Sequence, residues 1–370
     1  MTKVKKTFLF LCFFPIFYSA LSQVPAGYYQ SAVGKSGEEL RSALFGIIRN
    51  HTVVAYDDLW SAYYYTDRMS SGKVWDIYSD VPGGTAAFYF TFGTDKCGNY
   101  SSEGDCYNRE HTIPKSWFGD ATPMLSDLFH LYPTDGYVNN RRGNFAYGEV
   151  TNPTYTSSNG SKVGPCAYPQ CSGTVFEPID AYKGDLARTY FYMTVRYMDK
   201  NLGQTAESMF DGSSLKTWVQ NMLTEWHIED PVSAKEIDRN NVIYNNFQHN
   251  RNPFIDCPEL VEYLFGAHEG DPWYPTCVDW DPIAVEEYHL AELQSCHIYP
   301  NPVENTCVLT SNYLPIDKVE IFDCAGRQVS RLSAVGTKQT ELPTTKLPSG
   351  IYFVQVDTRQ TVETIKLIVK

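Results

Sequence analysis

The segment that decides the fold is the densest polar stretch of the chain, Asn108-Arg109-Glu110-His111-Thr112-Ile113-Pro114. Two further stretches follow it, Asp127-Leu128-Phe129-His130-Leu131-Tyr132-Pro133 and Val138-Asn139-Asn140-Arg141-Arg142-Gly143-Asn144. Thr134 or Asp135 can cap a short helix that Gly143 ends, because a side-chain oxygen satisfies the first backbone N–H groups and glycine terminates helices. A spacing of three then puts Asn139 and Arg142 on one helix face. We therefore expect a hairpin carrying Glu110 and His111 to face this helix.

Glu110, His111 and Asn139 are the residue types that metal-assisted hydrolysis needs. A carboxylate and an amide oxygen are hard ligands suited to Mg²⁺, which keeps several waters and accepts phosphate oxygens. An imidazole with a pKa of about 6.5 can take a proton from water near neutral pH. A Glu-His pair alone is weak evidence, since the alternative is an ordinary pair at the surface or at the edge of the core.

Around this segment, the larger part of the chain has a mostly helical pattern. Apolar residues at helical spacing predict helices over residues 36–50, 57–65, 184–200, 214–226 and 231–247. The last helix is expected to have Asp230 as its N-cap and Pro231 at its first position. In the helix at 184–200, one face is apolar: Leu186, Tyr190, Met193 and Tyr197.

Two stretches in the same part of the chain lack helical spacing. Residues 76–107 are rich in Gly, Ser and Asn, which predicts short strands and loops. Residues 152–171 are rich in Ser, Thr, Gly and Pro and are expected to form an exposed loop. The larger domain should therefore be mostly helical with a small β component.

From about residue 294 the pattern changes to short apolar or alternating runs separated by Pro, Gly, Asn and Asp. This pattern is typical of a small β-sandwich. The fold class is thus α+β, with four expected parts: a signal peptide at 1–22, a catalytic domain at 23–285, an acidic linker at 286–295 and a β-sandwich at 296–370.

The first residues predict export from the cell. Lys3, Lys5 and Lys6 precede an apolar run from Phe8 to Tyr18, and small residues follow at a position suited to a signal peptidase. The run is shorter than the roughly 20 residues of a membrane-spanning helix, and no later segment is longer. We expect a secreted or cell-surface protein without a transmembrane segment after cleavage.

Cysteine usage agrees with an exported protein, in which disulfides are the default. The nearest neighbours are expected to pair, as Cys97 with Cys106 and Cys166 with Cys171, which leaves Cys257 with Cys277. Other connectivities stay open, and a zinc site is the competing interpretation, although the chain has no Cys-x-x-Cys pair. The C-terminal part has three cysteines, Cys296, Cys307 and Cys324, so one is expected to stay unpaired.

The formal net charge is −13, and loss of the three early lysines would leave 27 basic and 43 acidic residues. Phosphate neutralisation supplies most non-specific affinity for nucleic acid, so this charge excludes a protein that holds DNA by general electrostatics. Contact with nucleic acid would need a local basic patch and metal ions, with strong dependence on salt.

At this point the chain resembles the endonuclease I family, whose site is a ββα-metal, or His-Me finger, motif. The resemblance spans residues 38 to 267 and covers four separated motifs in order: the Glu110-His111 segment, residues 138–144, residues 184–193 and Gln248-His249-Asn250-Arg251-Asn252-Pro253-Phe254. Carried over, it makes His111 the general base and Glu110 and Asn139 the ligands of Mg²⁺, with Mn²⁺ or Ca²⁺ as substitutes. The products would carry 5′-phosphates.

Three further residues are candidates for substrate binding. Arg142 shares a helix face with Asn139, and arginine can hold phosphate with two hydrogen bonds; its alternative is a surface salt bridge. Asn250 and Arg251 lie in a family motif and bind substrate or brace the site. The family's transition-state arginine has no secure position here, and His130, among apolar neighbours, is expected to be packed rather than catalytic.

The C-terminal part resembles the sorting domain of the type IX secretion system. The resemblance rests on Ile298-Tyr299-Pro300-Asn301-Pro302, residues 319–323, Gly326-Arg327 and residues 347–354. It implies type IX secretion machinery as a partner. The alternative is an accessory sandwich that binds carbohydrate or a surface, since a fold alone does not set function.

Together these features predict a secreted, metal-dependent, sequence-nonspecific endonuclease that takes DNA and also RNA as substrate. Two alternatives remain: a phosphodiesterase of narrower range, and a catalytically inactive surface protein that binds nucleic acid.

Overall fold

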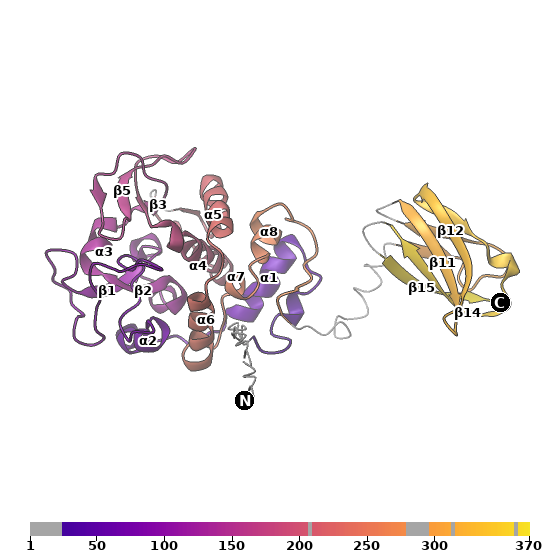
Figure 1. Cartoon of the computed structure of the whole chain (residues 1–370), viewed down its shortest axis with the longest axis horizontal. Coiled ribbons are helices and arrows are strands. Elements are labelled where there is room, and N and C mark those ends of the chain that lie inside the picture. The colour runs from indigo at the N-terminus through magenta and orange to yellow at the C-terminus, as the bar shows by residue number, and fades with distance from the viewer. Residues whose placement is uncertain (1–23, 206–208, 279–295, 312–314, 359–361) are drawn as a thin grey trace, which may run out of the picture. The chain divides into compact units, whose positions relative to one another are not determined.

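The computed structural model describes residues 24–205, 209–278, 296–311, 315–358 and 362–370. The chain divides into two compact units, Met1–Asp281 and Pro282–Lys370, and each is described by itself (Figure 1). The expected signal peptide (1–22) and linker (286–295) lie outside the described residues. Within the described part, no helix combines the length and hydrophobicity that a membrane crossing requires.

The first unit is built around helix α4 (Lys183–Arg196), in which every residue is buried. Figure 1 shows α4 in the middle of the unit, and it packs against α1 (Gly37–Ile48), α5 (Thr217–Glu229) and α7 (Pro253–Asp256). The sequence predicted this helix with one apolar face, whereas the structure buries its polar face as well. The buried polar side chains are paired: Arg188 donates to the Glu236 carboxylate of α6 (Ala234–Asn246) at 2.6 and 2.9 Å.

The predicted helices are present, with shifted ends. The remaining α-helices are α2 (Leu59–Thr66), α3 (Gly136–Arg142) and α8 (Leu260–Phe265). Short 3₁₀ helices connect them: η1 (Gln30–Ala32), η2 (Tyr56–Asp58), η3 (Lys115–Trp117), η4 (Met124–Ser126), η5 (Leu128–His130) and η6 (Asp180–Tyr182). The helix expected from residue 214 begins only at Thr217, because strand β8 (Ser214–Leu215) precedes it.

The expected N-cap of α6 is wrong. Ser233, not Asp230, caps the helix: its hydroxyl accepts from the Glu236 backbone N–H at 3.1 Å, and the Glu236 carboxylate accepts from the Ser233 N–H at 2.8 Å. This reciprocal capping box satisfies two backbone donors at once. The Asp230 carboxylate instead accepts from the backbone N–H of Gly184 in the first turn of α4, at 2.8 Å.

The strands of the first unit form three small sheets. β1 (Tyr107–His111) pairs with β2 (Leu131–Asp135), and β7 (Phe210–Asp211) pairs with β8. The third sheet has the order β3-β6-β5-β4, from β3 (Ala146–Tyr147), β4 (Tyr155–Thr156), β5 (Lys162–Pro165) and β6 (Thr174–Glu177).

Two loop predictions need correction. The stretch 152–171 is not only an exposed loop, because it supplies β4 and β5, and Val163 of β5 is buried in the core. The stretch 76–107 lacks the short strands that its composition predicted, since the described residues there form only turns and the isolated bridge Lys96↔Tyr107 before β1 begins.

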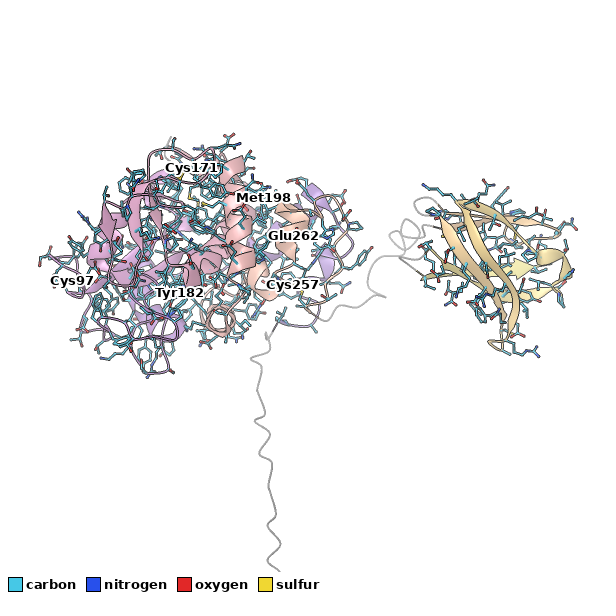
Figure 2. The ribbon with its side chains drawn as sticks, turned by 45° about the horizontal axis from the view of Figure 1, so that its top comes forward. Cys97, Cys171, Tyr182, Met198, Cys257 and Glu262 are labelled. Carbon is cyan, nitrogen blue, oxygen red and sulfur yellow. A yellow bond between two sulfur atoms is a disulfide. The ribbon has the colours of Figure 1, made fainter. Side chains whose placement is uncertain are left out.

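All three expected disulfides are present: Cys97–Cys106, Cys166–Cys171 and Cys257–Cys277. Figure 2 labels one cysteine of each, and the three lie in separate regions of the unit. The zinc alternative is therefore wrong for these cysteines, because a thiolate joined in a disulfide cannot ligate a metal.

The second unit consists of two antiparallel sheets around one apolar core. The larger sheet has the order β12-β11-β14-β15, from β11 (Ile316–Asp323), β12 (Gln328–Thr337), β14 (Gly350–Asp357) and β15 (Val362–Val369). The smaller has the order β13-β10-β9, from β9 (Cys296–Tyr299), β10 (Cys307–Ser311) and β13 (Gln339–Leu342); η7 (Thr344–Lys346) follows it. Alternate residues of both sheets, such as Leu309 and Val354, enter the shared core.

The cysteines of this unit do not follow the expectation of one bonded pair. Cys296, Cys307 and Cys324 all lie outside the disulfides. Cys296 pairs in register with Ser311 at one end of β10, whereas Cys307 stands at the other end opposite Leu342. The register therefore separates the two buried thiols by the length of the strand.

His227, which contacts Arg188 of α4, predicts a loss of stability in acid. Burial, followed by the positive charge of Arg188, lowers the pKa of His227 to about 4. The unfolded chain takes up a proton near pH 6.5 that the folded chain refuses until about pH 4, so stability falls across that window. We expect His227→Gln to reduce the loss of unfolding free energy between pH 6.5 and 4.5 by up to about 3 kcal/mol. The thermal midpoint of the variant should therefore fall less than that of the wild type over this pH range.

Tryptophan fluorescence can follow this transition in the first unit alone, because all seven tryptophans precede residue 281. The control is His268→Gln, which removes a histidine with an exposed side chain. Identical pH profiles for His227→Gln and the wild type would contradict the role of His227.

Candidate active site

The strand pair β1–β2 runs directly into helix α3, and this continuity places the predicted site residues. Tyr107 to His111 stand opposite Asp135 to Leu131 in an antiparallel register. Asp135 ends β2 and caps α3, since its carboxylate accepts from the Val138 backbone N–H at 2.8 Å. Gly143, with φ of +56°, ends the helix as expected. The cap and the glycine thus limit α3 to seven residues beside β1.

Asp76 supports this arrangement from a distant part of the chain. Its buried carboxylate accepts from the backbone N–H of Asp135 and from that of Tyr78, both at 2.8 Å. One aspartate therefore fixes the start of α3 and the position of Tyr78, whose hydroxyl contacts the site. Asp76 and Tyr78 could not be predicted as site residues from the sequence, because nothing in the local pattern links residues 76–78 to residues 110 or 135.

Glu110 is a buried carboxylate with defined partners. Its side chain is 2% exposed, and Oε1 accepts from the Tyr78 hydroxyl at 2.8 Å and from the Arg142 Nη1 at 2.9 Å. Burial raises the pKa of Glu110 to about 7, while Arg142 and Tyr78 act in the opposite direction. A cation near this carboxylate would favour its ionised form.

His111 is held in one tautomer. Its Nε2 lies 3.0 Å from the carbonyl oxygen of Leu125, and because a carbonyl only accepts, Nε2 carries the proton and Nδ1 keeps its lone pair. The ring stacks on Tyr56, with centroids 6.0 Å apart. Burial, and then the neighbouring His130, lowers the pKa of His111 to about 3. The imidazole is therefore neutral and able to accept a proton.

Asn139 lies on α3 opposite β1. Its Nδ2 donates to the backbone carbonyl of Arg109 at 3.3 Å, so Oδ1 is the atom of this amide that remains to accept. Glu110, His111 and Asn139 all line one cavity of about 260 Å³. The structure thus brings together the three residues that the sequence analysis placed at the chemical centre.

Two cations and an aromatic ring complete the wall of this cavity. Arg109 stacks on the Tyr56 ring at 3.7 Å and donates to the Tyr56 carbonyl at 2.8 Å, and Lys115 pairs with the exposed Asp120 at 3.2 Å. Neither cation was predicted as a site residue from the sequence. Arg109 could have been noticed, because a strand that contributes Glu110 and His111 also brings Arg109 close to them.

The contact of Arg142 with substrate phosphate stays a prediction: Arg142 lines the cavity of Glu110, His111 and Asn139, but its guanidinium already has partners within the fold. Its side chain is 1% exposed, and its guanidinium donates to Glu110 Oε1 at 2.9 Å, to the His111 carbonyl at 2.8 Å and to the Thr112 carbonyl. The helix spacing placed Arg142 on the same face of α3 as Asn139. Spacing alone does not reveal that neighbours on that face bond the guanidinium.

Asn250 and Arg251 are both buried and make contacts within the fold, and their binding of substrate stays a prediction. Arg251 is buried and donates to both carboxylate oxygens of Asp256, at 2.7 and 2.8 Å. Asn250 is buried and donates to the Tyr192 hydroxyl at 2.8 Å. Of the two open interpretations, support of the fold agrees with these contacts. His130 is packed as expected, with Nε2 against the Met124 carbonyl.

Two family models match the chain. Residues 36–259 match endonuclease I, a range that includes every candidate site residue above, and residues 297–370 match a secretion system C-terminal sorting domain.

Relatives with known names agree with the first match. The chain is 36% identical over 248 residues to an extracellular ribonuclease of Bacillus amyloliquefaciens and 35% identical over 243 residues to one of Bacillus subtilis; each alignment covers 64% of this chain and 78% of the relative. It is also 30% identical over 131 residues to an endonuclease-1 of Buchnera aphidicola, covering 35% of this chain and 44% of the relative. The sorting domain and the extracellular relatives identify a secreted or cell-surface protein.

The geometry of the site predicts that Arg142 is needed for stability. Arg142→Met removes the cation but keeps a long side chain, which leaves the Glu110 carboxylate buried without its charge partner. We expect a loss of about 3–5 kcal/mol in unfolding free energy, measured by urea unfolding. The control is Arg141→Met on the same helix, where the exposed guanidinium stacks on Tyr155 at 4.8 Å, and a loss below about 1 kcal/mol is expected. Equal losses would refute the role of the buried pair.

Proposed function

The chain belongs to the endonuclease I family, and on this premise we propose that it is a secreted, metal-dependent nuclease that hydrolyses phosphodiester bonds of DNA and RNA with little sequence preference. The observation that carries the proposal is the shared cavity of Glu110, His111 and Asn139. A neutral imidazole beside two oxygen donors is the arrangement that metal-assisted hydrolysis of a phosphodiester requires. In this proposal β1, β2 and α3 form the ββα-metal motif.

Glu110 and Asn139 would hold the ion. Their oxygens are hard ligands, and one carboxylate with one amide leaves several positions for water and phosphate, which suits Mg²⁺, with Mn²⁺ or Ca²⁺ as substitutes. The fit is supported by the buried Glu110 carboxylate, whose pKa is raised to about 7. A second positive charge beside it would favour the ionised form that ligates a metal. When bound, such an ion supplies charge stabilisation to the phosphate and to the leaving oxygen.

His111 acts as the general base. Its Nδ1 takes a proton from a water molecule, the water oxygen forms the new bond to phosphorus, and the bond from phosphorus to the 3′-oxygen breaks with its electron pair left on that oxygen, which takes up a proton from solvent water. The products then carry a 5′-phosphate and a 3′-hydroxyl. The hydrogen bond from Nε2 to the Leu125 carbonyl fixes the ring and stabilises the positive charge that develops on it.

Arg109 and Lys115 are further candidates for phosphate contacts beside Arg142, whose guanidinium is already bonded to Glu110. Both line the cavity, and Lys115 has a half-exposed side chain. Arg109 is also our candidate for the transition-state arginine, because its stack on Tyr56 holds the guanidinium against the cavity wall. A local pair of cations is consistent with a polyanionic substrate on a chain whose net charge is −13.

The second unit directs export. We propose that its two sheets form a β-sandwich that is recognised by type IX secretion machinery, in agreement with the sorting-domain match.

Digestion of supercoiled plasmid by the purified full chain tests the activity. We expect nicked and then linear products with Mg²⁺ or Mn²⁺, and none with EDTA. Parallel digestion of total RNA determines whether both nucleic acids are substrates. Hydrolysis of a small phosphodiester with the plasmid left intact would favour the narrower phosphodiesterase, and retardation without cleavage would favour an inactive binding protein.

The base assignment is tested by His111→Ala. A positioned base contributes about 10²- to 10⁴-fold, so kcat should fall by that factor while binding of nucleic acid and the unfolding midpoint change little. The matched control is His268→Ala, which truncates an exposed histidine and should keep wild-type turnover. If His111→Ala turned over substrate at the wild-type rate, another group would have to be the base.

A further inference from the structure

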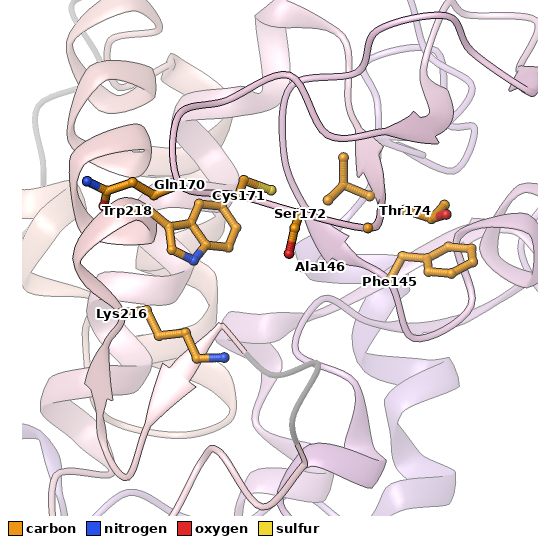
Figure 3. A pocket seen from close by; sticks show the side chains of 10 residues that line it. Phe145, Ala146, Gln170, Cys171, Ser172, Thr174, Lys216 and Trp218 are labelled. Carbon is orange, nitrogen blue, oxygen red and sulfur yellow. The ribbon is translucent and has the colours of Figure 1, made fainter.

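A second cavity lies next to the proposed catalytic cavity. It measures about 290 Å³ and is lined by residues 145–146, 170–175, 216 and 218 (Figure 3). One chain segment after α3 lines both cavities, since Gly143 and Asn144 line the first and Phe145 and Ala146 line the second. A strand bound at the first cavity can therefore continue along this segment toward the second.

The walls of the second cavity combine aromatic rings with a cation. Figure 3 shows Trp218 and Phe145 on opposite sides, with Cys171 and Ser172 of the intervening loop between them and Lys216 below. Phe145 is 39% exposed, so its ring is accessible to a ligand in this cavity. The disulfide Cys166–Cys171 holds the loop that faces Trp218.

The charged side chain in the lining of this cavity is positive, whereas the net charge of the chain is negative. Among the described residues that line it there is Lys216 but no carboxylate, although the chain as a whole has a net charge of −13. The next cavity along the surface shares Gln170 and Trp218 with it and has Glu225 and Glu262 in its wall. This distribution of charge favours a polyanion on the Lys216 side of Trp218 over the side of Glu225 and Glu262.

We propose that the second cavity is a subsite for one or two unpaired nucleotides next to the cleaved bond, with a base stacked on Phe145 or Trp218 and a phosphate near Lys216. Aromatic rings stack on any base because every base has a π-face, which gives affinity without sequence preference. This inference rests on the proposed nuclease function and adds a substrate class to it: single-stranded nucleic acid.

The same geometry discriminates against duplexes. In a double helix the bases are stacked on each other and paired, so their faces are not available to Phe145 or Trp218 unless the duplex opens, which costs free energy. A duplex can still present its phosphates to the first cavity. The subsite therefore raises the rate of cleavage of single strands selectively. Cleavage of duplexes depends on the cations and the metal ligands of the first cavity alone.

Phe145→Ala and Trp218→Ala test the subsite by the ratio of two rates. We expect kcat/KM on a single-stranded oligonucleotide to fall by about tenfold or more for each variant, and kcat/KM on duplex DNA to stay within about twofold of wild type. Trp218→Phe, which keeps a stacking ring, should retain most of the single-strand rate. The matched control is Tyr65→Ala, an exposed aromatic residue that lines none of the three cavities and should change neither rate.

A binding measurement separates this inference from the nuclease assignment. In EDTA, oligothymidylate and oligouridylate are titrated against each variant by fluorescence anisotropy, so that no cleavage is required and DNA and RNA strands are compared. Weaker binding by both alanine variants, but not by Tyr65→Ala, supports the subsite even if the wild type cuts nothing. Unchanged binding and unchanged rates would overturn it. An equal loss on single strands and duplexes would also overturn it, because it would mean that the two rings only support the active site.

Discussion

The buried ion pair between Arg142 and Glu110 is the interaction on which the site depends. One guanidinium, at the end of α3, bonds the Glu110 carboxylate of β1 and the two carbonyls that follow it in the chain. A buried charge that loses its partner costs several kcal/mol, so neither the helix nor the strand can shift alone without leaving Glu110 or Arg142 buried and unpaired. The Asp135 cap and the Asp76 carboxylate then fix where α3 begins. The short helix is therefore held at both ends, and Asn139 lies between them.

The same burial acts on two consecutive residues and favours the neutral form of each. It raises the pKa of Glu110 and lowers that of His111. A neutral imidazole is what a general base requires, and the Leu125 carbonyl stabilises it without adding a charge. A neutral carboxylic acid, in contrast, is a poor metal ligand, and Arg142 and Tyr78 oppose its protonation. The partners of the two side chains are thus matched to the different roles that we propose for them, His111 as proton acceptor and Glu110 as metal ligand.

Sequence patterns predicted what depends on neighbours along the chain and missed what depends on distant segments. The Asp135 cap, the end of α3 at Gly143 and the pairing of near cysteines follow from local chemistry, and the structure has them. The burial of Arg142, Asn250 and Arg251 could not be read from spacing, because a helix face or a motif does not reveal what packs against it. Asp76 and Tyr78 were missed because their partners lie more than thirty positions away. The capping box of α6 was available in the sequence as Ser233 and Glu236, but the nearby Asp-Pro pair was given more weight.

An acidic chain that binds a polyanion must gain its affinity at short range. Long-range repulsion from the net charge is screened beyond about 10 Å at 0.1 M salt, so it weakens as ionic strength rises. Salt also weakens the proposed contacts of Arg109 and Lys115 with phosphate, because releasing the same counterions into a more concentrated solution gains less entropy. Stacking on Phe145 and Trp218 depends little on salt, since it involves no charge. As ionic strength rises, the aromatic cavity therefore supplies a growing share of the affinity, and it does so only for strands whose bases are exposed.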